Sequence, residues 1–176
     1  DDFEGTSLGS QWTDLAGGDG NYFVADGAIT FSETSHVRSV RSFATPLIIR
    51  ATLNKATSCD NHYIKLSTEP WDEGGRSLYD PGVVALSWSC GYRYIRGQTE
   101  SASTYCTEER MYDIEITVDD SRVTFTDADG ACDELVLQDT IGASSERLYV
   151  YVGVDTYYYS AAWHSVEICR WLLAPT

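Results

Sequence analysis

The fold is decided by the stretch RMYDIEITVDDSRVTFTDADG, residues Arg110–Gly130. Apolar residues alternate with polar residues over 114–118, and they alternate again over 123–125, after a polar turn. A side-chain period of two on both sides of a tight turn is typical of a β-hairpin with one buried face and one exposed face. The stretch therefore predicts antiparallel β-structure.

The rest of the chain repeats this pattern and shows no helical periodicity of useful length. Strand-like runs are separated by turns rich in Gly, Asp and Ser, a spacing that is typical of antiparallel sandwiches. We predict an all-β, two-sheet antiparallel β-sandwich that fills residues 1–176 as a single domain. The other expected strands lie in 23–31, 36–43, 46–54, 62–67, 83–89, 92–96, 135–138, 148–154 and 162–171.

The charge of the chain excludes some partners. The 176 residues contain 12 Lys and Arg against 27 Asp and Glu, which gives a formal net charge of −15. Such a chain is repelled by nucleic-acid phosphates and by anionic membrane surfaces. It also contains no run of ~18 apolar residues. We therefore expect no nucleic-acid partner and no membrane insertion.

The first residue and the cysteines predict an extracellular, secreted protein. The chain opens on Asp1 rather than Met, as expected of a mature chain whose leader has been removed. No Cys-x-x-Cys pair occurs, so disulfides are expected rather than zinc. Cys90 and Cys106 flank residues 91–105 and are predicted to form one bridge. The other three cysteines can form at most one further bridge, so one thiol is left over, either buried or joined to another chain.

Several segments, taken in order, resemble the concanavalin A-like lectin/glucanase superfamily, which includes laminin G-like domains. The resemblance rests on an opening Asp-Asp-Phe, on Trp12, and on the segments 24–31, 46–53, 112–129, 148–154 and 162–168. It implies a jelly roll of two stacked sheets, with sugar binding or glycan cleavage on the concave sheet. The final strand has Trp163-His164-Ser165-Val166, where members often have an aromatic residue followed by Asp-Asp-Val.

The catalytic motif of the glucanase members is missing from the sequence. No Glu-x-Asp-x-x-Glu string occurs, and the nearest segment, 113–117, has Thr117 as its third polar residue. That segment is interpreted as a solvent-facing strand. No Gly-x-Ser-x-Gly elbow occurs either. The sequence therefore predicts that the protein is not an enzyme and has no catalytic residues.

One acidic turn is a candidate metal site. Asp127, Asp129 and Asp133 surround Gly130, and Ca²⁺ takes six to eight oxygen ligands. The hypothesis is that these three residues contribute to calcium binding. The alternative is an ordinary hairpin turn.

Aromatic residues are the candidate glycan-binding groups, because sugar rings stack on Trp and Tyr. In 148–154 the Leu and Val residues face one way and the tyrosines the other. The loop 69–82 is the longest expected loop. Cross-strand packing of the aromatic residues is the alternative to binding. The predicted glycan-binding residues are Trp71, Asp72, Tyr92, Tyr94, Arg96, Tyr149 and Tyr151.

Two functions follow from these patterns. The first is a secreted, lectin-like, carbohydrate-binding module without enzymatic activity. The alternative is a structural subunit of an extracellular filament or matrix, and hence a homo-oligomer. The apolar segment 169–176, the odd cysteine and the abundant tyrosines favour this alternative.

Overall fold

The protein is described by a computed structural model that covers residues 2–15, 22–32, 35–54, 62–70, 83–89, 92–96, 101–105, 110–119, 122–130, 132–138, 147–154 and 160–170. In these ranges all regular structure is β-strand, so the predicted all-β class is confirmed. The strands are β1 (Trp12–Asp14), β2 (Tyr22–Ala25), β3 (Ala28–Ser32), β4 (Ser35–Ser39), β5 (Phe43–Ala44), β6 (Leu47–Asn54), β7 (His62–Ser67), β8 (Val83–Ser89), β9 (Tyr92–Arg96), β10 (Ser101–Tyr105), β11 (Met111–Val118), β12 (Arg122–Asp127), β13 (Leu135–Gln138), β14 (Arg147–Val154) and β15 (Ser160–Arg170).

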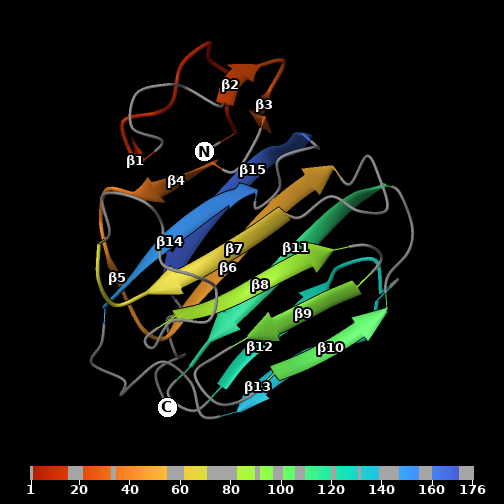
Figure 1. Ribbon diagram of the computed structural model, residues 1–176. Helices are drawn as coiled ribbons and strands as arrows, with labels where there is room; N and C mark the ends of the chain where they lie inside the picture. Colours follow the sequence, from red (N-terminus) through yellow and green to blue (C-terminus); the bar gives the residue numbers. More distant parts are fainter. Residues whose placement is uncertain are drawn as a thin grey trace.

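The strands form two antiparallel sheets that are stacked face to face (Figure 1). The front sheet of Figure 1 has the order β1-β4-β14-β7-β8-β9-β10, with β5 paired to β14. The back sheet has the order β13-β12-β11-β6-β15-β3-β2. The predicted two-sheet sandwich is therefore confirmed. None of the described segments forms a helix that could span a membrane.

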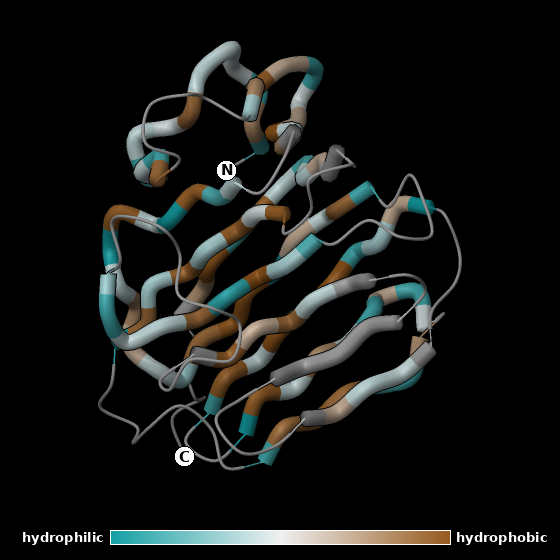
Figure 2. Tube along the Cα trace, viewed as in Figure 1, coloured by the Kyte–Doolittle hydropathy of each residue, from teal (hydrophilic) through white to brown (hydrophobic). Residues whose placement is uncertain are grey.

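Alternating burial explains why these segments become strands. Along β6 every second residue from Leu47 to Leu53 is buried, and β11 buries every second residue from Tyr112 to Val118. Figure 2 shows the same alternation as bands of apolar and polar residues along the strands. The buried residues of both sheets form one core between the layers. Its apolar burial is the main stabilising term of the sandwich.

The β-hairpin predicted in residues 110–130 is present. Register pairs Ile114 with Asp127 and Val118 with Val123, so β11 and β12 are antiparallel neighbours. The side chain of Asp119 accepts a hydrogen bond from the backbone N–H of Arg122 at 2.9 Å. On its other side β11 pairs with β6, which places it in the interior of the back sheet.

A β-bulge interrupts the last strand. The register of β15 against β6 shifts between Trp163 and Ser165. Because the bulge adds one residue, Trp163 and Val166 both face the core, although they are three positions apart. Ser165 instead hydrogen-bonds Thr52 on the outside of the back sheet, with 3.2 Å between the hydroxyl oxygens.

Candidate functional site

The outer face of the front sheet carries aromatic and cationic side chains. On β14, the Leu and Val side chains belong to the core between the sheets, whereas Tyr149 and Tyr151 belong to a separate cluster on the other side. Register places Arg38 of β4 on one side of Tyr151 and Lys65 of β7 on the other. The neighbouring outward row contains His36, Gly153 and Tyr63. We define the front-face cluster as His36, Arg38, Tyr63, Lys65, Tyr149 and Tyr151.

Two cations of this cluster lie against aromatic rings. The Lys65 ammonium is 4.9 Å from the ring centroid of Tyr151 and 5.9 Å from that of Tyr63. The Arg38 guanidinium is 5.3 Å from the ring centroid of Tyr149. Lys65 is only 2% exposed, and a cation–π contact is stronger when it is shielded from water. The rings therefore hold these charges in fixed positions.

His36 lies between the two tyrosines of the cluster. Its ring centroid is 6.3 Å from that of Tyr63 and 5.9 Å from that of Tyr151. Burial and the charge of Lys65 lower the pKa of His36 to about 4, although Asp14 acts in the opposite direction. The imidazole is therefore neutral at pH 7. A neutral imidazole can accept a proton, which is the capacity that a general base needs.

Gly153 makes the position of His36 possible. A Cβ at residue 153 would collide with the carbonyl oxygen of Ser35 and would lie 2.6 Å from the Cβ of His36. Both obstacles belong to β4, the strand that pairs with β14. Only glycine lets the two strands approach while the imidazole lies over β14.

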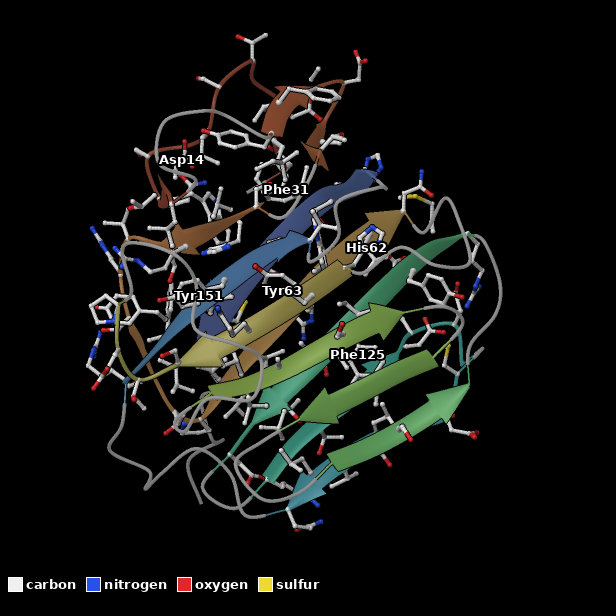
Figure 3. All side chains as sticks on the ribbon, in the orientation of Figure 1. Asp14, Phe31, His62, Tyr63, Phe125 and Tyr151 are labelled. Carbon is white, nitrogen blue, oxygen red and sulfur yellow. The ribbon has the colours of Figure 1, made fainter. Side chains whose placement is uncertain are left out.

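The cluster is covered rather than open to solvent. Leu15 packs against Tyr63 and Tyr151, and the Tyr151 hydroxyl donates a hydrogen bond to the carbonyl oxygen of Glu69 at 3.2 Å. Tyr151 is 0% exposed as a result. Figure 3 shows Tyr63 and Tyr151 beside each other on adjacent strands of the front sheet.

The strands of the front sheet are poor in carboxylates. Retaining glycosidases use two carboxyl groups about 5–5.5 Å apart. The segments β4, β5, β7, β8, β9, β10 and β14 contain neither Asp nor Glu, and Asp14 of β1 is the carboxylate residue among the described strands of this sheet. The cluster instead offers a neutral imidazole, phenol groups and an ammonium charge.

The structure brings two of the predicted glycan-binding residues into this cluster, Tyr149 and Tyr151. Tyr92, Tyr94 and Arg96 belong to β9 of the same sheet, but their side chains are outside the described part. Trp71 and Asp72 are also outside the described residues.

The residues predicted from the sequence did not include His36, Arg38, Lys65 or Gly153. The alternations His36-x-Arg38 and Tyr63-x-Lys65 were available as a signal, because alternate residues share a strand face. These residues lie close together because β4 and β7 both pair with β14.

The predicted calcium ligands have another partner. Arg110 reaches both Asp127 and Asp129, with 3.0 Å between nitrogen and oxygen in each pair. Its guanidinium also lies 4.7 Å from the ring centroid of Tyr112. Among the described residues no three His, Cys, Asp or Glu side chains are grouped so as to hold a metal, and Asp133 does not join the other two. Calcium binding stays a prediction, with Arg110 as a competitor for these carboxylates.

The cysteines are only partly described. Cys132 is disulfide-bonded, whereas Cys169 is a free, half-buried thiol. The partner of Cys132 therefore lies outside the described residues. The predicted pair Cys90 and Cys106 also lies there. Burial, followed by the interaction with Glu167, raises the pKa of the Cys169 thiol.

Comparison with known proteins identifies the fold. No protein-family model and no curated protein sequence matches this chain. Solved structures do match. The endo-β-1,3-glucanase of Pyrococcus furiosus aligns with a TM-score of 0.69 at 10% identity, over 99% of this chain and 94% of that chain.

Two further structures show the same likeness. Porphyranase B from Zobellia galactanivorans aligns with a TM-score of 0.65 at 8% identity, over 96% of this chain and 90% of the enzyme. The Crh5 transglycosylase aligns with a TM-score of 0.67 at 15% identity, over 97% and 82% of the two chains. The chain thus has the concanavalin A-like jelly-roll fold that its sequence resembles.

This comparison corrects one prediction. The absence of a Glu-x-Asp-x-x-Glu string led to the expectation that the protein is not an enzyme. That expectation is contradicted, because the similar structures are carbohydrate-active enzymes. The expectation was wrong in its reasoning too, because a missing motif excludes one arrangement of catalytic groups and not catalysis itself.

Proposed function

We propose that the protein binds a polysaccharide along the outer face of the front sheet and cleaves it. One observation carries the proposal: the front-face cluster gathers Tyr63, Lys65 and His36 from β7 and β4, the two strands that flank β14, on a fold that carbohydrate-active enzymes share. Tyrosine rings can stack on the C–H faces of sugars, and Tyr149 is the half-buried tyrosine of this cluster.

The cluster also supports proton transfer. His36 is neutral at pH 7 because burial lowers its pKa, so it can take a proton from the water molecule that bonds to the anomeric carbon and return that proton to the glycosidic oxygen that leaves. The nearby Lys65 ammonium stabilises negative charge that develops during bond cleavage. In this proposal His36 is the acid–base group and Lys65 is the electrostatic stabiliser. A substrate would have to displace or slide under Leu15 and the Glu69 segment, which cover Tyr151.

The test is a cleavage assay on a panel of soluble neutral and acidic polysaccharides. We expect new chain ends and a falling mean chain length with at least one of them, measured by size-exclusion chromatography. His36→Gln should lower the rate at least 100-fold, since acid–base groups typically contribute about 10²–10⁴-fold.

Arg50→Gln is the matched control, because Arg50 lies on the outer face of the back sheet and is 53% exposed. It should keep the wild-type rate. Equal rates for His36→Gln and Arg50→Gln would refute the assignment of His36. No cleavage of any polysaccharide would refute the proposed activity.

Other expectations from the sequence stay predictions. We predict that the protein is secreted and extracellular. The filament or matrix alternative relied on the segment 169–176, of which 171–176 lies outside the described residues.

A further inference from the structure

A cavity of about 380 Å³ lies at one end of the sandwich. It is formed where β5 and the start of β14, at the left edge of Figure 1, meet the start of β6 and the end of β15. Both sheets therefore contribute to its walls. No residue of the front-face cluster lines it. Pockets that bind small molecules typically measure about 300–1,000 Å³, so this cavity is large enough for one.

Two arginines that line the cavity are not neutralised by the described part of the chain. Arg50, Arg110 and Arg122 each form an ion pair with a carboxylate. Arg41 and Arg147 line the cavity and form no ion pair with any described residue. Carboxylates outnumber cations in this chain, yet no described carboxylate pairs with these two guanidinium groups. The two charges give the cavity a local positive potential, which attracts anions.

The guanidinium of Arg147 is held in place by Ser42, which also lines the cavity. Its Nε donates a hydrogen bond to the Ser42 hydroxyl at 2.9 Å, and a terminal nitrogen donates to the Ser42 carbonyl oxygen. A guanidinium has more N–H donors than these two bonds use, so others are available to a ligand. Guanidinium and carboxylate groups form strong, charge-assisted hydrogen bonds. The cavity therefore contains a positioned donor for a carboxylate.

The remaining described walls of the cavity are uncharged. Phe43, Ala44 and Leu47 line it with hydrocarbon groups, and Cys169 adds a half-buried thiol. Burial, followed by the interaction with Glu167, raises the pKa of this thiol, so it is neutral at pH 7 and does not repel an anion. A small inorganic anion would contact the arginines and leave the hydrocarbon groups in contact with water.

We infer that this cavity binds a small organic carboxylate. The carboxylate group of the ligand pairs with Arg41 and Arg147, and its apolar body packs against Phe43. The charged group accounts for the two arginines, and the apolar body accounts for the hydrocarbon walls. This is a second binding site, and it does not depend on cleavage of a polysaccharide at the front-face cluster.

The test is an NMR titration of the ¹⁵N-labelled wild-type protein at pH 7 with benzoate, hexanoate, acetate and benzyl alcohol. Benzoate and hexanoate carry both parts of the ligand, acetate carries the charge alone, and benzyl alcohol carries the apolar body alone. We expect benzoate or hexanoate to bind at least tenfold more tightly than acetate and benzyl alcohol, and to shift the backbone amide signals of 41–44. Binding of neither acid, or an equal affinity for acetate or benzyl alcohol, overturns the inference.

Two variants with the same change in net charge locate the site. Arg41→Gln should weaken the binding of the preferred acid at least tenfold, because it removes a charge-assisted partner of the carboxylate. Arg122→Gln is the matched control, since Arg122 lies on the back sheet, is 53% exposed and pairs with Asp119. It should bind the acid like the wild-type protein.

Equal affinities of Arg41→Gln and Arg122→Gln for the preferred acid overturn the assignment of the cavity. Arg41 is exposed, so its substitution should leave the fold intact, and circular dichroism checks this. If the variant is unfolded, Arg147→Gln decides in its place, with the same expected loss of affinity.

Discussion

The two outer faces of the sandwich use similar residues in opposite ways. On the back sheet, Arg50 lies 2.8 Å from a carboxylate oxygen of Glu115 and 3.7 Å from one of Glu167, and all three side chains are at least one-third exposed. Thr52 donates a hydrogen bond to Asp113 beside them at 2.6 Å. On the front sheet, Lys65 is buried against aromatic rings. Exposed ion pairs contribute little to stability, whereas burying a charge carries a desolvation penalty.

In a β-sandwich, the face with buried charges is a better candidate for a functional site than the face with exposed ion pairs. The back face satisfies each charge locally and in contact with water. On the front face, charged side chains are buried and lie close to the titratable imidazole of His36.

Gly153→Ala should have the largest effect on the free energy of unfolding, because the short distance between β4 and β14 leaves no room for the added methyl group. The new methyl group would meet the backbone of Ser35 and the Cβ of His36, and neither is the flexible end of a side chain. We expect a loss of about 3 kcal/mol in the free energy of unfolding, as for overpacked cores. Urea denaturation measures it.

Gly130→Ala is the matched control for this substitution. A Cβ at Gly130 would meet nothing within 4 Å, although the φ of +65° strains any other residue. Only the conformational cost of about 1 kcal/mol is expected there. A loss at Gly153 no larger than the loss at Gly130 would show that the strand approach is not needed.

The stability of the front face should depend on pH through His36. Its pKa is about 4 in the folded state and 6.5 in the unfolded state, so the unfolded state binds the proton more readily. The contribution of the neutral imidazole is complete above pH 6.5 and is lost as the pH falls toward 4. Between pH 7 and pH 5 the expected loss is about 2 kcal/mol.

Urea midpoints at pH 7 and pH 5 measure this loss in the wild-type protein. His36→Gln removes the titrating group and should remove most of the pH dependence in that window. A variant that loses stability between pH 7 and pH 5 as steeply as the wild-type protein would contradict the assignment to His36.

A pair of conservative substitutions compares the two faces directly. Tyr151→Phe removes the hydrogen bond to the carbonyl oxygen of Glu69 and should lower the free energy of unfolding by about 1 kcal/mol. Arg50→Gln breaks exposed ion pairs on the back face and should leave stability at the wild-type value. Thermal melts monitored by circular dichroism measure both, and the reverse order of effects would be evidence against the comparison.

Local alternation was enough to predict much of the fold. The hairpin in 110–130 and the two-sided strand 148–154 were read correctly, because a period of two survives wherever one face is buried. The bulge between Trp163 and Ser165 was not predictable in this way. One inserted residue moves every later side chain of the strand to the opposite face of the sheet, and the amino-acid composition does not reveal where the insertion lies.

The candidate site was less accessible to sequence reasoning. Tyr149 and Tyr151 were found because they share one strand, whereas His36 and Lys65 come from strands far away in the sequence. Their proximity depends on β4 and β7 flanking β14, and strand order is a property of the whole sheet. The expectation that the protein is not an enzyme rested on the absence of two known motifs, a carboxylate string and a nucleophile elbow, and the absence of known motifs does not exclude other catalytic arrangements.

The insertion of β14 between β4 and β7 has a consequence for how the protein is made. The backbone N–H of Val150 donates a hydrogen bond to the Ser39 hydroxyl, a partner 111 residues earlier in the chain. On the ribosome, β4 and β7 emerge long before the strand that separates them. Until β14 is synthesised, the edges of β4 and β7 that will pair with it have no partner strand. Until β14 pairs with them, these two edges are available for pairing with other chains, so aggregation competes with folding at this stage.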